Sequence, residues 1–208
     1  MHLELSELLA CPRCGPGQGL VVSVDRIEDR RVREGWLACP GCDARYPVGR
    51  GGIDFGEAAG CGGDSGGGDP EDAVRVAALL GLREGGGVVL LGAGLESAAA
   101  GVAELAGGVE VLALSLAPDG PAAPRVTRLL GVRGGALPLH GRRLRGAALA
   151  GGSPELLAEA ARVVRPGGRV AVLRPTPDLD VPGELPLRVL AAEAAAIVAE
   201  RTPEESGP

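Results

Sequence analysis

The chain has 208 residues, which is enough for one medium domain or for a small domain followed by a medium one. Its formal net charge of −6 argues against bulk affinity for nucleic acid. No apolar run reaches membrane-spanning length without a charge or a glycine cluster, and the amino terminus lacks a signal-peptide pattern. The sequence therefore predicts a cytoplasmic protein with no membrane association.

Four cysteines stand in two Cys-x-x-Cys pairs that are separated by 24 residues. The pairs are Cys11 with Cys14 and Cys39 with Cys42, and each has a proline after its first cysteine. Two such knuckles that face each other across a hairpin place four thiolates where they can coordinate one ion tetrahedrally. Four cysteine thiolates are the ligand set of a structural zinc site. The prolines fix one φ angle in each tight turn, and Gly41 relieves crowding in the second.

The competing interpretation is two disulfides or two redox-active pairs. It is the weaker one, because no signal peptide is present and a thioredoxin-type pair needs only one knuckle, at the start of a helix. Four thiolates leave no open coordination position, so a zinc ion here is structural and not catalytic. Cysteines in metal spacing also indicate a reducing compartment. Cys61, the fifth, lies in a glycine-rich stretch and is interpreted as an incidental thiol.

The first 56 residues predict a small zinc-ribbon β domain. Its three large aromatic residues, Trp36, Tyr46 and Phe55, are the only ones in the chain. We expect them to form a core beside the metal, since apolar burial alone cannot hold so small a unit. The expected elements are a short helix over 3–9, antiparallel strands over 20–26 and 31–38 with a turn at 28–29, and short strands over 46–48 and 52–55.

Residues 3–55 resemble the multifunctional methyltransferase activator family. The resemblance is carried by LSELLACPRC at 5–14, LACPGCDARYPV at 37–48 and GI at 52–53. It implies a zinc protein that stabilises tRNA, ribosomal-RNA and release-factor methyltransferases by lying along the edge of their sheet. A protein partner related to translation is therefore expected.

After a glycine-rich flexible linker over 57–69, residues 70–201 alternate between strand and helix patterns, and a disordered tail follows over 202–208. Strand alternating with helix predicts a parallel α/β sheet. Asp69 and Pro70 are read as the cap and first residue of a helix, and Ser153 as the cap of another. The expected helices are 70–82, 96–105, 154–164 and 187–201, and the expected strands are 88–91, 109–114 and 169–173.

Residues 71–175 resemble a class I S-adenosylmethionine-dependent methyltransferase. The evidence is VVLLGAG at 88–94, ALP at 136–138 and LLAEAARVVRPGGRVAV at 156–172. The resemblance implies S-adenosylmethionine as cofactor and places Gly92 and Gly94 in its first loop. Ser115 falls where the family carries an acid that holds both ribose hydroxyls. The fold class is thus α/β, a zinc ribbon followed by a truncated Rossmann-like domain.

Several residues that the family's cofactor site needs are absent. Leu90 stands where an acid is usual, Glu96 replaces the third glycine, and Ser115 offers one neutral hydroxyl instead of a carboxylate. Residues 134–136, near the fourth strand, offer no Asp for the adenine amine. This half also has no aromatic residue to stack on adenine. A bare Gly-x-Gly commonly marks only a tight turn between a strand and a helix.

The end of the chain predicts a sheet shortened by two strands. Pro175, Pro177 and Pro182 interrupt it, and one alanine-rich helix over 187–201 follows. Without the family's last two strands, an exposed edge is left that its own helix or a partner must cover.

Residues 121–174 hold ten arginines and only two acids, Glu155 and Glu159. This stretch is either a docking face for RNA or an acidic protein, or a solvated face enriched in arginine, and the second interpretation is favoured. His140 also lies here and is expected at the surface.

Two functional hypotheses remain open. In the first, a zinc module is fused to a non-catalytic methyltransferase-like domain, a pseudoenzyme that acts through a protein or RNA partner and binds S-adenosylmethionine weakly or not at all. In the second, an active methyltransferase carries its zinc activator in cis. The missing pocket residues favour the first, and no catalytic residue is assigned.

Overall fold

The computed structural model describes residues 1–56, 69, 71–83, 85–92, 94–115, 123–132 and 136–203. The amino-terminal half, residues 1–56, begins with a short 3-10 helix, and four strands follow. Asp29 and Arg30 both adopt left-handed φ angles, 48° and 60°, in the turn of the first hairpin, which suits a two-residue hairpin turn. The elements are η1 (Leu3–Leu8), β1 (Val21–Glu28), β2 (Arg31–Ala38), β3 (Arg45–Gly49) and β4 (Gly52–Asp54).

The carboxy-terminal half alternates strand and helix and then ends in a hairpin. Ser153 caps α3 by accepting a hydrogen bond from the backbone N–H of Leu156 (3.3 Å). Asp69 lies two residues before the α1 cap and accepts from the N–H of Glu71 (2.9 Å). The elements are α1 (Asp72–Leu79), β5 (Gly87–Leu91), η2 (Glu96–Ala98), α2 (Ala99–Leu105), β6 (Val109–Ser115), β7 (Val126–Leu130), β8 (Leu144–Ala150), α3 (Pro154–Val163), β9 (Val164–Leu173), β10 (Leu187–Glu193) and β11 (Ala196–Arg201).

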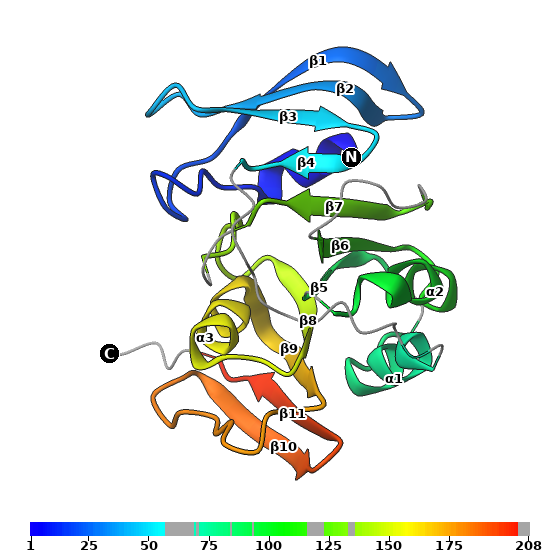
Figure 1. The fold of residues 1–208 in the computed structure, drawn as a ribbon, viewed down its shortest axis with the longest axis vertical. Coiled ribbons are helices and arrows are strands. Elements are labelled where there is room, and N and C mark those ends of the chain that lie inside the picture. The colour runs from blue at the N-terminus through cyan, green and yellow to red at the C-terminus, as the bar shows by residue number, and fades with distance from the viewer. Residues whose placement is uncertain are drawn as a thin grey trace.

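All eleven described strands belong to one sheet, in the order β1-β2-β3-β4-β7-β6-β5-β8-β9-β11-β10 (Figure 1). The strands from β7 to β9 pair in parallel, and the direction of winding reverses between β5 and β8. A parallel sheet wound outward from a central switch point is the Rossmann-like arrangement. The α/β fold class, with a small β ribbon followed by a methyltransferase-type sheet, is confirmed.

Two apolar cores lie on the two faces of the sheet, as the alternation along β5 shows. Val89 and Leu91 belong to the core packed against α1 and α2, whereas Leu90 points into the core that α3 covers. This second core runs without a break into the amino-terminal half, where it includes Leu37 and Ile53. The two halves therefore share one hydrophobic core as well as one sheet.

The joint between the halves is a parallel pairing of β4 with β7. Ile53 pairs with Leu129, and the N–H of Phe55 donates to the carbonyl of Leu130 (3.0 Å). An ion pair between Arg31 and Glu110 (3.1 Å) spans the same boundary. The expectation that the first half lies along the sheet edge of the second is confirmed. The covered edge is β7, at the opposite side of the sheet from the edge that the sequence suggested.

The helix predicted over 187–201 is wrong, and so is the shortened sheet. The segment forms β10 and β11, and β11 pairs antiparallel with β9 from Ala196 opposite Leu173 to Glu200 opposite Arg169. Alanine-rich composition favours a helix, but the β-branched residues Ile197 and Val198 fit a half-buried pleat. The unpaired backbone groups along β9 then favour a strand over the local helix preference.

Trp36 does not join the core beside the metal, because it lies on the outer face of β2 with 44% of its surface exposed. It pairs with Ser23 and Pro47, while the next residue, Leu37, points inward and is fully buried. Tyr46 and Phe55 are buried as predicted, with ring centroids 5.0 Å apart.

Other expectations fall partly or wholly outside the described residues. These are the linker over 57–69, of which only Asp69 is described, Cys61, Pro70, and the tail over 202–208 beyond residue 203. Within the described part of the chain, no helix is long and apolar enough to span a membrane. The cytoplasmic location stays a prediction.

Candidate metal centre and cofactor edge

The two Cys-x-x-Cys knuckles meet in the structure. The sulfur atoms of Cys11, Cys14, Cys39 and Cys42 all lie within 4.8 Å of one another. The Sγ atoms of Cys11 and Cys42 are 3.7 Å apart, and those of Cys14 and Cys39 are 3.8 Å apart. A tetrahedral zinc ion with Zn–S bonds of about 2.3 Å places its sulfurs about 3.8 Å apart. Disulfides need about 2.05 Å, and all four are free thiols, so the geometry fits a metal and not two disulfides.

Each knuckle is closed by the same backbone arrangement. The N–H of Gly15 donates to the carbonyl of Cys11 (2.9 Å), and the N–H of Asp43 donates to the carbonyl of Cys39 (3.0 Å). Gly15 and Asp43 each follow the second cysteine of a knuckle and have left-handed φ angles of 91° and 57°. Glycine and aspartate tolerate this conformation better than most residues. The N–H of Gly41 also points at the sulfur of Cys39 (3.4 Å).

The buried sulfur of Cys11 is held by hydrogen-bond donors. Burial raises the pKa of the Cys11 thiol, but hydrogen bonds from the Tyr46 hydroxyl and from the backbone N–H groups of Cys14 and Arg13 outweigh burial and bring the pKa to about 6. The hydroxyl oxygen of Tyr46 lies 3.5 Å from that sulfur. A stabilised thiolate is the protonation state that a metal requires.

The metal centre adjoins the joint between the halves. The residue before Cys11, Ala10, donates its N–H to the carbonyl of Pro138 (3.0 Å), and Leu9 forms a bridge with Leu139. His140 places its Nδ1 2.7 Å from the carbonyl oxygen of Pro16, in the loop that follows the first knuckle. Hydrogen bonds on both sides of the first knuckle therefore hold it against the carboxy-terminal half.

The predicted cofactor residues lie at the carboxyl ends of neighbouring strands. Gly92 and Gly94 follow β5, and Ser115 ends β6, which pairs with β5 in parallel. In open α/β sheets, ligands bind at this edge, beside the switch point. The structure therefore brings the three residues to the edge where a nucleotide cofactor would sit.

These residues do not fit S-adenosylmethionine well. Leu90, at the position of the family's acid, is fully buried in the apolar core, and Ser115 is a neutral side chain with 6% exposure. A Cβ on Gly92 would lie 3.0 Å from Leu149 and one on Gly94 3.2 Å from Ala150, so both glycines serve packing. Gly94 also has a left-handed φ of 86°. Residues 134 and 135 lie outside the described part of the chain.

Sequence reasoning treated Glu96 only as a missing glycine. Its Oε2 atom is buried and has no hydrogen-bond partner among the described residues. A buried carboxylate oxygen without a partner is costly, and a bound ion, an ordered water or a catalytic role are among the reasons that proteins keep one. Glu96 opens η2, directly after the loop of Gly92 and Gly94.

A second missed feature is an ion pair between a buried aspartate and a half-exposed arginine at the same edge. Asp72, at the start of α1, is completely buried, and its carboxylate accepts hydrogen bonds of 2.8 and 3.1 Å from Nη1 of Arg174. Arg174 directly follows β9 and has a left-handed φ of 49°. Its pKa is raised by the hydrogen bond to Asp72. No sequence pattern signalled this pair, because its members are 102 residues apart.

Of the ten arginines in 121–174, those that the structure describes lie in different surroundings, and their role as a docking face stays a prediction. Arg162 pairs with Glu159 and Arg174 with Asp72. Arg145, Arg165 and Arg169 line a cavity at the other end of the strands.

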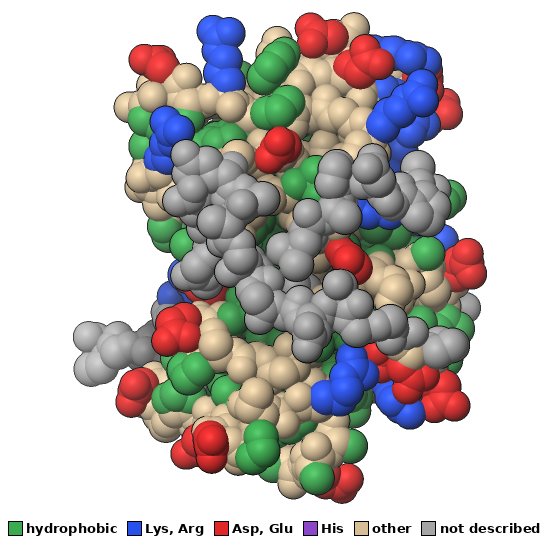
Figure 2. All heavy atoms as spheres, in the orientation of Figure 1, with side chains coloured by type: hydrophobic (Ala, Val, Ile, Leu, Met, Phe, Trp, Pro, Cys, Tyr) green, Lys and Arg blue, Asp and Glu red, His purple; other side chains and the backbone are tan. Residues whose placement is uncertain are grey.

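Figure 2 shows acidic and basic side chains next to each other at the end of the molecule that holds β1 and β2, where Arg26 and Arg33 both pair with Glu28.

No protein-family model and no curated protein matches this chain. Among solved structures, it is similar to the antibiotic-resistance methyltransferase Kmr, with 14% identity over 63% of this chain and 93% of that one, at a TM-score of 0.44. It is also similar to a tRNA methyltransferase from Aquifex aeolicus, with 15% identity, coverage of 64% and 69%, and a TM-score of 0.45. A putative methyltransferase from Bacillus halodurans shows 20% identity, coverage of 52% and 54%, and a TM-score of 0.40. At these scores, the fold class rests on the strand order described above.

Proposed function

We propose that the chain is a zinc protein whose methyltransferase-like half is non-catalytic and acts through a protein or RNA partner. The observation that carries the proposal is the cofactor edge, where Leu90 and Ser115 stand in place of the acids that hold S-adenosylmethionine in the resembled family. Uncharged side chains at both positions remove the charge-assisted bonds on which cofactor affinity depends.

We further propose that the first half is a methyltransferase activator module fused in cis. The four-cysteine cluster supports a structural zinc ion, and the pairing of β4 with β7 supports a stabilising role, because it covers a sheet edge that would otherwise expose unpaired backbone groups. In this proposal Cys11, Cys14, Cys39 and Cys42 hold the zinc. A cytoplasmic, translation-related protein partner is the partner class that the resemblance implies.

One observation favours the alternative, an active S-adenosylmethionine-dependent methyltransferase. The Oε2 atom of Glu96, which has no partner among the described residues, belongs to the residue that opens η2, directly after the glycine loop, and supplies a carboxylate at that edge of the sheet. In that case, Glu96 would replace the missing acids in an unorthodox pocket.

Calorimetric titration of the intact chain with S-adenosylmethionine separates the two proposals. The non-catalytic proposal predicts no measurable heat, or a Kd above roughly 100 μM, a binding free energy of about 5.5 kcal/mol or less. Micromolar binding that is lost in Glu96→Gln, and kept in Glu104→Gln on the following helix, would contradict it and support the active enzyme.

A further inference from the structure

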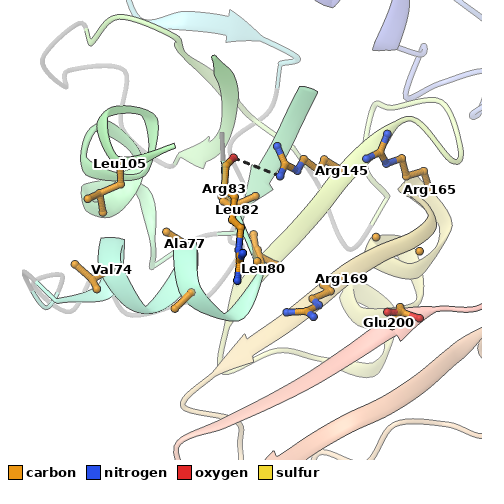
Figure 3. Close-up of a pocket in the computed structure, with 14 residues that line it drawn as sticks. Val74, Ala77, Leu80, Leu82, Arg83, Leu105, Arg145, Arg165, Arg169 and Glu200 are labelled. Atoms are coloured by element: carbon orange, nitrogen blue, oxygen red, sulfur yellow. Dashed lines mark hydrogen bonds between the residues drawn. The ribbon is translucent and has the colours of Figure 1, made fainter. Parts of the chain in front are cut away.

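A cavity lies at the opposite end of the sheet from the cofactor edge. It has a volume of about 760 Å³ and opens where β8 and β9 begin, beside the carboxyl end of α1 (Figure 3). Gly92 and Ser115 stand at the carboxyl ends of their strands, whereas this cavity is lined by residues at the amino ends. It is therefore a separate site, independent of the proposed function.

Two arginines in the cavity are fixed in place by neutral backbone groups. Arg145 donates from Nη1 to the carbonyl of Gly85 (2.7 Å) and from Nη2 to the carbonyl of Arg83 (3.4 Å). Arg169 donates from Nη1 to the carbonyl of Leu79, at the end of α1 (3.3 Å). Carbonyl partners orient a guanidinium group but do not neutralise its charge, and each group keeps N–H donors to spare.

Two more arginines, Arg83 and Arg165, line the cavity. Both are exposed, and neither side chain makes a hydrogen bond or an ion pair with a described residue. The one acid among the described lining residues, Glu200, is already paired with Arg188 (3.0 Å). Within the described part of the chain, the cavity therefore gathers four arginines against one carboxylate, which Arg188 also shares, although the net charge of the protein is −6.

Glycines make room for these side chains. A Cβ on Gly81 would lie 3.1 Å from Nη1 of Arg169, and one on Gly87 would lie 3.5 Å from the side chain of Arg145. Both glycines have left-handed φ angles, 63° and 119°. A side chain at position 81 would therefore crowd the guanidinium group of Arg169, whereas one at position 87 would be strained by its backbone conformation.

From this arrangement we propose that the cavity binds a phosphate group. Guanidinium forks match phosphate oxygens, and several arginines without acidic partners repel one another unless an anion lies among them. No aromatic side chain stands among the described lining residues, so a nucleobase finds no stacking partner there, and recognition is directed at the phosphate itself. The volume falls within the range of small-molecule sites. Val74, Ala77 and Leu105 form an apolar wall that can contact the organic part of the ligand.

Isothermal titration of the intact chain with pyrophosphate, and separately with a twelve-nucleotide single-stranded RNA, tests the site. The diagnostic variant is Arg83→Ala combined with Arg165→Ala, since neither side chain supports the fold. We expect pyrophosphate to bind one to one, and the double variant to bind roughly a hundred-fold more weakly, about ten-fold per arginine. The corresponding double change to Lys keeps charge but removes the fork, and should give an intermediate loss.

Arg50→Ala, which removes an exposed arginine in the turn between β3 and β4, is the matched control and should bind like the intact chain. If pyrophosphate binding alone is lost in the double variant, the phosphate belongs to a small molecule. If RNA binding is lost as well and is the tighter of the two, the phosphate belongs to a nucleic-acid backbone, and both results support the site. Binding of neither probe below millimolar concentration, or equal binding by the double variant, would overturn the proposal.

Discussion

The two halves of the sheet differ in how complete a set of ligand-binding side chains each one has. The amino-terminal half holds four cysteine sulfurs within 4.8 Å of one another, a complete ligand set. The carboxy-terminal half has a Rossmann-like strand order and glycines at the carboxyl end of β5, but Leu90 and Ser115, at positions where the resemblance implies acids, carry no charge. Gly92 shows why such a scaffold can persist without a ligand: a side chain there would meet Leu149 at 3.0 Å. A glycine motif can therefore be maintained by packing alone, whereas packing accounts for only two of the four cysteines, because Cys14 and Cys42 are exposed.

The largest expected effect follows from removing one metal ligand. Metal coordination supplies on the order of ten kcal/mol to the folding of such sites. The Cys39→Ser variant should therefore not bind zinc, and its amino-terminal half should no longer show a cooperative thermal unfolding transition. The Cys61→Ser variant should keep both the zinc and the transition. Elemental analysis and thermal melting check this prediction. A protein purified without zinc, or with its four cysteines oxidised, would contradict the prediction that the four cysteines hold a zinc ion.

A core substitution at the joint should affect both halves together. Leu129 is fully buried and pairs with Ile53 across the boundary. Leu129→Ala should lower the free energy of unfolding by about 2–5 kcal/mol, against less than about 1 kcal/mol for the exposed Leu105→Ala. Urea unfolding followed by Trp36 fluorescence and by circular dichroism should shift equally with both probes. A shift in circular dichroism without one in Trp36 fluorescence would mean that the halves unfold independently.

Arg174→Ala tests the ion pair with the buried Asp72 at the cofactor edge. It leaves the fully buried carboxylate of Asp72 without its main partner, and it should lower the free energy of unfolding by about 2 kcal/mol after allowance for the half-exposed arginine. Arg188→Ala, which breaks the more exposed pair with Glu200, should change it by less than about 1 kcal/mol. Equal losses in the two variants, measured by urea unfolding, would show that the burial of Asp72 does not matter.

The smallest effect is expected from restoring one acid. Ser115→Asp should strengthen S-adenosylmethionine binding by roughly ten-fold, because it rebuilds charge-assisted bonds to the ribose. Ser97→Asp, at an exposed position in η2, adds the same charge without that placement and should leave binding unchanged. If calorimetry finds no increase in affinity for S-adenosylmethionine in Ser115→Asp, something other than the missing charge prevents binding at the cofactor edge.

Local patterns predicted most of the elements. The doubled knuckle led to the metal cluster, and Ser153 followed by Pro154 marked the start of α3. The segment over 187–201 was predicted incorrectly because its alanines favour a helix locally, while the decisive partner, the open edge of β9, is distant in sequence. The exposed position of Trp36 depends on strand register, and the Asp72–Arg174 pair depends on tertiary contact. None of these three is encoded in a local pattern.

We infer that the amino-terminal half and the methyltransferase-like half form one structural unit through β4 and β7. Expressing residues 68–208 alone tests it most directly, because this fragment exposes the β7 edge and the apolar residues that Ile53 and its neighbours cover. We predict that the fragment aggregates, or melts more than about 10 °C below the intact chain, as expected for the loss of several kcal/mol. A soluble fragment with the thermal stability of the intact chain would contradict the claim.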